Sequence, residues 1–78
     1  MNDFIFMMVI YDDKVIYSFG RSGKSERTKE GKFTYDILKF PLYVKVYGTV
    51  TAKSAQRVRE IIRKHIEKTY PDKKAVEE

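Results

Sequence analysis

The stretch that decides the fold is residues 52–69, with the sequence AKSAQRVREIIRKHIEKT. At 100° per residue one face of a helix carries the apolar residues Ala55, Val58, Ile61, Ile62 and Ile66, together with His65. The other faces carry the basic residues Lys53, Arg57, Arg59, Arg63, Lys64 and Lys68. One amphipathic helix cannot bury its own apolar face, so the earlier residues must form a surface against which it packs.

Both ends of this helix have sequence signals. Thr51 is a suitable N-cap, and Pro71 disfavours helical angles at Tyr70, so we expect the helix to end near Thr69. Residues 71–78, PDKKAVEE, have little apolar content with which to pack. The sequence therefore predicts one compact domain at residues 1–70 and a flexible C-terminal tail at residues 71–78.

The N-terminal residues predict a β-hairpin. Residues 3–11, DFIFMMVIY, form a continuous apolar run, Asp12-Asp13 makes a two-residue turn, and residues 14–20 return as a second strand. A two-residue loop places Tyr11 opposite Lys14, and this pairing defines two faces. One face holds Ile5, Met7, Val9, Tyr11, Ile16 and Ser18, and the other holds Phe4, Phe6, Met8, Ile10, Val15, Tyr17 and Phe19. Neither face is polar.

The next segments differ in how clearly they can be read. Residues 20–32, GRSGKSERTKEGK, have no apolar side chain, and a mobile loop, a short polar helix near residues 25–30 and a hairpin turning at Glu30-Gly31 all stay open. Residues 33–39 fit either a short strand or, at residues 36–39, one helical turn. From Pro41 onward an amphipathic strand is clear: Leu42, Val44, Val46, Gly48 and Val50 should face the helix, and Tyr43, Lys45, Tyr47 and Thr49 should face solvent or a partner.

These elements predict an α+β fold of two layers. We expect a three- or four-stranded, mostly antiparallel sheet with one C-terminal amphipathic helix across one side. The helix covers only one side, whereas the N-terminal hairpin is apolar on both. Residues 21–40, a second copy of the chain or a bound ligand must cover the other side, and we expect a homodimer.

Composition limits the possible chemistry. The chain has 78 residues, no cysteine and a single histidine, which excludes disulfides and thiolate zinc sites and argues against a histidine-based metal site. We expect no cofactor, and we expect His65 to be a structural residue at the edge of the core. No apolar run reaches membrane-spanning length and Asp3 is unlike a signal peptide, so we expect a cytoplasmic protein. Abundant Lys, Glu and Ile with one Asn and one Gln is typical of heat-adapted proteins.

Charge points to a polyanionic partner. The net charge is +5 and the pI about 9.5, with the positive charge in residues 20–32 and in the helix. Lysine and arginine bind phosphates, and tyrosines on an open sheet can stack on bases. The predicted binding residues for DNA or RNA are Arg21, Lys24, Arg27, Lys29, Lys32, Tyr43, Lys45, Tyr47, Lys53, Arg57, Lys64 and Lys68.

No catalytic motif is complete. The string GRSGKS at residues 20–25 lacks the spacing of a P-loop, and the carboxylates form no recognisable acid–base pair. The leading hypothesis is a small basic nucleic-acid-binding protein without catalytic activity. The alternatives are a protein-interaction module, such as an inhibitor or assembly subunit, that uses the apolar hairpin, and a nuclease.

The nuclease alternative comes from a resemblance. The order of elements resembles a GIY-YIG nuclease module, with residues 4–6 and 18–20 in place of its two motifs and Arg27 near the position of its catalytic arginine. Phe6 and Ser18 replace the two tyrosines, and Arg59 replaces the metal-binding glutamate, so the resemblance implies a non-catalytic DNA-binding relative. The order of a sheet followed by a helix, with Tyr47-Gly48-Thr49 leading into the helix, also resembles DNA-binding domains of the integrase-arm and AP2 types.

Overall fold

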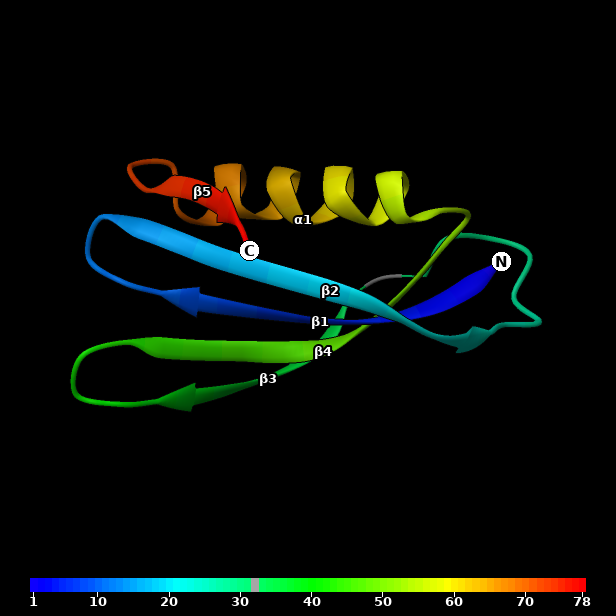
Figure 1. The fold of residues 1–78 in the computed structure, drawn as a ribbon, viewed down its shortest axis with the longest axis horizontal. Coiled ribbons are helices and arrows are strands. Elements are labelled where there is room, and N and C mark those ends of the chain that lie inside the picture. The colour runs from blue at the N-terminus through cyan, green and yellow to red at the C-terminus, as the bar shows by residue number, and fades with distance from the viewer. Residues whose placement is uncertain (32) are drawn as a thin grey trace.

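The computed structural model describes residues 1–31 and 33–78 as one sheet and one helix (Figure 1). The elements in chain order are β1 (Asn2–Ile10), β2 (Lys14–Lys24), β3 (Thr34–Lys39), β4 (Val44–Ala52), α1 (Ala55–Thr69) and β5 (Lys74–Glu77). The strands lie in the order β3-β4-β1-β2-β5, with antiparallel pairs except for β2 and β5, which are parallel. The predicted α+β class with a C-terminal helix is confirmed.

The hairpin of β1 and β2 has the predicted register. Ile10 lies opposite Val15, so Tyr11 and Lys14 flank a two-residue turn and the amide of Tyr11 donates to the carbonyl of Lys14. Every second side chain of the hairpin therefore faces α1, as expected. β2 does not end at Gly20 but continues to Lys24, where it pairs with Asn2 after a bulge beside Asp3.

The core lies between α1 and this side of the sheet. Val58, Ile62 and Ile66 of α1 are fully buried or nearly so, and they pack over the centre of the sheet. The buried strand residues are Phe4, Phe6, Met8, Ile10, Val15, Tyr17, Val46, Val50 and Ala52. The helix thus covers one side of the sheet only, and Figure 1 shows no element of the described chain across the other side.

The helix begins later than predicted. Ser54, not Thr51, is the N-cap, and its hydroxyl accepts from the amide of Arg57 at 3.2 Å. Thr51 and Ala52 instead complete β4, where they pair with β1, and both are buried. The strand predicted from Pro41 onward is confirmed as β4, but it begins only at Val44, and Leu42 is 84% exposed rather than facing α1.

Residues 34–39 form a strand rather than a helical turn. β3 is the edge strand and pairs with β4 from Thr34 opposite Thr49 to Lys39 opposite Val44. Its backbone approaches β4 so closely that a Cβ on Gly48 would lie 1.9 Å from the carbonyl oxygen of Thr34. Of the open alternatives for residues 20–32, the short helix is wrong: residues 20–24 belong to β2, and the described residues 25–31 contain no helix.

The C-terminal segment differs from the expected frayed tail. β5 adds to the free edge of β2, and the amide of Glu78 donates to the carbonyl of Tyr17 at 2.9 Å. The Glu77 carboxylate accepts hydrogen bonds from the guanidinium of Arg59 and from the Tyr17 hydroxyl. Residues 74–78 have few apolar side chains to bury, so strand pairing with β2 and the ion pair with Arg59 keep this segment against the sheet.

Candidate nucleic-acid interface

Four unpaired cations gather where α1 begins. We call this group the basic end, and its members are Arg21, Lys24, Lys29 and Lys53. All four are exposed. Figure 1 shows the last part of β2, the segment after it and the start of α1 at the same end of the molecule. The ion pairs of the described residues involve only Arg57 and Arg59, so these four charges are free to meet an anion.

Lys53 lies at the centre of the basic end. It lines a hollow of about 410 Å³ together with Arg21 and Ser54. On its other side it lines a second hollow of about 460 Å³ with Lys29 and Arg57. Because Lys53 lines both hollows, Arg21 and Lys29 lie on either side of it, although the three residues come from separate segments of the chain.

Asn2 fixes the geometry between two of these segments. Its side-chain Oδ1 accepts from Nη2 of Arg21 at 2.5 Å, and its Nδ2 donates to the carbonyl of Lys53 at 3.4 Å. Asn2 also lies opposite Lys24 in the β1–β2 ladder. One side chain of β1 therefore connects the end of β2 with the approach to α1.

The N terminus of α1 adds to the positive potential. The first turn carries no acidic residue, and Ser54 satisfies only the amides of Arg57 and Val58. The amides of Ala55 and Gln56 have no hydrogen-bond partner among the described residues. Free amides at a helix N terminus favour phosphate oxygens, and here they lie beside Arg21 and Lys53.

Two other predicted residues at this end are already engaged. Arg57 forms ion pairs with Glu30, at 2.8 Å, and with Glu60, at 3.1 Å, and the Glu30 hydrogen bond is the main cause of its raised pKa. Arg27 donates to the hydroxyl of Thr51 at 3.4 Å. Both contacts stabilise residues 25–31 against the body of the protein, so phosphate binding at these positions would have to compete with them.

The remaining predicted residues lie elsewhere. Lys64 and Lys68 are exposed near the far end of α1, and at 1.5 Å per residue Lys68 is about 20 Å from the start of the helix. Tyr43, Lys45 and Tyr47 come from β4 and the residue before it, on the other side of the sheet. Lys32 lies outside the described residues. The structure therefore does not bring the twelve predicted residues into one surface.

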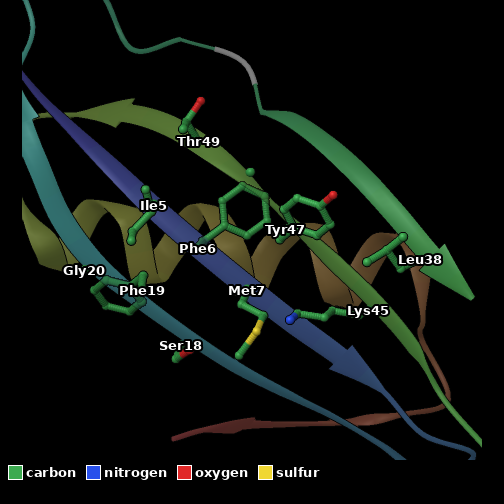
Figure 2. Close-up of a pocket in the computed structure, with 11 residues that line it drawn as sticks. Ile5, Phe6, Met7, Ser18, Phe19, Gly20, Leu38, Lys45, Tyr47 and Thr49 are labelled. Carbon is green, nitrogen blue, oxygen red and sulfur yellow. The ribbon is translucent and has the colours of Figure 1, made fainter. Parts of the chain in front are cut away.

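The side of the sheet away from α1 is a separate surface, which we call the open face. Figure 2 shows the side chains of its central groove, with α1 behind the sheet. The groove has a volume of about 750 Å³ and is lined mostly by apolar atoms, from Ile5, Phe6, Met7, Ser18, Phe19, Gly20, Leu38, Lys45, Tyr47, Gly48 and Thr49. Ile5 is 54% exposed, Leu38 44% and Tyr47 38%. Large apolar side chains exposed side by side are typical of interaction surfaces.

The tyrosines of the open face are not arranged in one row. Tyr43 stacks on Phe40 with ring centroids 4.8 Å apart and lies 5.9 Å from the ring of Tyr11. Tyr47 lies further along β4, next to Leu38 and Lys45 in the groove. Tyr43 is therefore partly covered by neighbouring rings, whereas Tyr47 presents its ring to solvent.

His65 is a structural residue in this arrangement. Its ring meets that of Phe33 edge-on at a centroid distance of 4.9 Å and that of Tyr35 at 6.0 Å. Burial lowers its pKa below the usual value, and the charge of Lys68 lowers it further. Within residues 1–31 and 33–78, no cluster of three or more side chains is suited to hold a metal ion. In the same residues, no helix is both long and apolar enough to cross a membrane.

Comparisons with family models, curated proteins and solved structures give no match. The resemblances to GIY-YIG modules and to integrase-arm or AP2 domains therefore stay predictions. At the position of the expected metal-binding glutamate, Arg59 forms an ion pair with Glu77. Arg27, at the expected catalytic position, contacts Thr51.

Sequence reasoning missed three contributors to these surfaces. Asn2 connects Arg21 with Lys53, but nothing in its local sequence marks this role, because both partners are distant along the chain. Ser54 could have been found, since serine three residues before Arg57 is as good an N-cap as Thr51. Leu38 belongs to the open face only because residues 34–39 form a strand, which the sequence left undecided.

Proposed function

We propose that this chain is a small nucleic-acid-binding protein without catalytic activity, and that the basic end is its phosphate-binding surface. The observation that carries the proposal is the convergence of Arg21, Lys29 and Lys53 on the exposed N terminus of α1. Phosphates are bound by such cations together with backbone amides at helix N termini. These contacts carry no sequence information, so we expect binding to DNA and RNA with little sequence preference.

The test is a titration of fluorescently labelled duplex DNA, single-stranded DNA and RNA at low salt, followed by anisotropy. Binding that weakens as salt is raised supports the proposal, because phosphate contacts release counterions. Absence of binding to all three probes at 50 mM salt would reject it. Incubation of the same probes with Mg²⁺ or Mn²⁺ tests the nuclease alternative, for which cleavage is the required result.

The open face favours a second function, binding to another protein chain. The N-terminal hairpin was the predicted interface, and its side away from α1 is the uncovered one. Met7 lies in the groove of this face, whereas Met8 is completely buried in the core. Binding of another protein chain is therefore tested by replacing Met7 with a charged residue. The same change at Met8 would unfold the protein and could not be interpreted.

A further inference from the structure

No helix or strand within residues 1–31 and 33–78 covers the open face, and the exposed surface area of the chain is correspondingly large. A self-contained monomer of 9.2 kDa exposes about 4,900 Å². This chain exposes 5559 Å². Its radius of gyration is 12.5 Å, against about 11.5 Å for a compact chain of this length. The excess surface of about 600 Å² approaches the roughly 800 Å² that each partner buries in a standard interface.

Charge on the open face argues against a polyanion as the occupant. By strand register, the charged side chains of β1, β2, β3 and β4 that face away from α1 are Asp3, Lys14, Asp36 and Lys45, two of each sign. The net charge of +5 therefore resides elsewhere on the molecule. A surface that is apolar and nearly neutral gains little from phosphates but is not repelled by an identical surface.

Two of these charges, Asp36 and Lys45, are self-complementary. Asp36 lies opposite Tyr47 in the β3–β4 ladder, and Lys45 lies two residue pairs further along, opposite Leu38. In a two-fold dimer each surface meets its own copy, so Lys45 of one protomer can approach Asp36 of the other. Around them, Ile5, Met7 and Leu38 supply apolar contact area, and Tyr47 is of the residue type enriched at the centre of protein interfaces.

We propose that the open face is the interface of a homodimer, in which two sheets pack face to face and the helices lie outside. Two stacked sheets separated by about 10 Å bury both grooves. The basic ends remain exposed in this arrangement, because they lie at the end of the molecule where α1 begins. If the proposed function holds, the dimer offers two phosphate-binding surfaces to one nucleic acid, but the interface itself does not depend on that function.

The test is the molar mass in solution, measured by light scattering and sedimentation over a concentration series. The wild-type chain should have about twice the mass of 9.2 kDa. Met7→Glu and, separately, Leu38→Glu should raise the dimer dissociation constant by about 30-fold or more, the loss typical of a residue at the centre of an interface. Lys64→Glu, on the outer surface of α1, is the matched control and should leave the mass unchanged.

Leu38 is 44% exposed on an edge strand, so Leu38→Glu keeps the test valid even if Met7→Glu disturbs the sheet. Far-ultraviolet circular dichroism verifies that each variant is folded. A wild-type monomer at millimolar concentration would overturn the proposal, whether or not that monomer binds nucleic acid. A dimer that survives both substitutions would also overturn it. In a wild-type monomer, loss of single-stranded DNA binding in Tyr47→Ala would identify the nucleic acid as the occupant of the open face instead.

Discussion

Replacing Arg21 and Lys53 together by alanine should halve the salt dependence of nucleic-acid binding. The structure gives the basic end four cations without a carboxylate partner in the described chain, namely Arg21, Lys24, Lys29 and Lys53. Each phosphate contact to duplex DNA contributes about −0.9 to the slope of log K against log salt, so four contacts predict about −3.6. With that slope, a rise from 50 to 200 mM salt weakens binding by about 150-fold.

The double variant keeps two of the four contacts. Its slope should be about −1.8, and the same rise in salt should weaken its binding by only about 12-fold. Fluorescence anisotropy with a labelled duplex, repeated at several salt concentrations, measures both slopes. If both copies of a dimer touch one duplex, each slope doubles while the ratio between wild type and variant is unchanged.

Lys64→Ala/Lys68→Ala is the matched control, because it removes two exposed lysines about 15–20 Å from the basic end. Its slope should equal that of the wild type. The reasoning is refuted if this control lowers the slope as much as the double variant at the basic end does. It is also refuted if Arg21→Ala/Lys53→Ala leaves the slope unchanged.

Three further predictions concern the fold. Ile62→Ala should lower the free energy of unfolding by about 2–5 kcal/mol in urea denaturation, because Ile62 is completely buried under the sheet. Gly48→Ala should weaken β3 pairing and increase amide hydrogen exchange in β3, since the new Cβ would overlap the Thr34 carbonyl, whereas Gly23→Ala has open space and should not. The pKa of His65 is lowered in the folded state, so the unfolded chain binds the imidazole proton more readily. The melting temperature should therefore fall as the pH drops below about 6.5, and His65→Phe should reduce that fall.

The hairpin and the helix were predictable because each has a strong local pattern. The apolar run of residues 3–11 and the Asp12-Asp13 turn predict a hairpin, the length of the turn sets its register, and the structure has that register. The helical face from Val58 to Ile66 likewise follows from its own spacing. In both segments the information lies within a few residues of the element it determines.

The rest depends on contacts between distant segments. Residues 21–24 look like a polar loop but continue β2, because β1 extends to Asn2 and offers a pairing partner. Residues 74–77 have only two apolar side chains. They form β5 because they pair with the edge of β2 and because the Arg59 guanidinium binds the Glu77 carboxylate. The basic end was predicted as charge in two separate segments, but its geometry depends on Asn2, about 50 residues from Lys53.

The most direct test of phosphate binding at the basic end is amide chemical-shift mapping by NMR while a short DNA duplex, and then a single strand, is added to the labelled protein. We expect shifts at the basic end, in Arg21, Lys24, Lys29 and Lys53, and at the first amides of α1. Amides of the open face, such as those of Met7 and Tyr47, should keep their positions, since a second copy covers them. Shifts confined to the open face, or no shifts with either nucleic acid, would contradict the assignment of phosphate binding to the basic end.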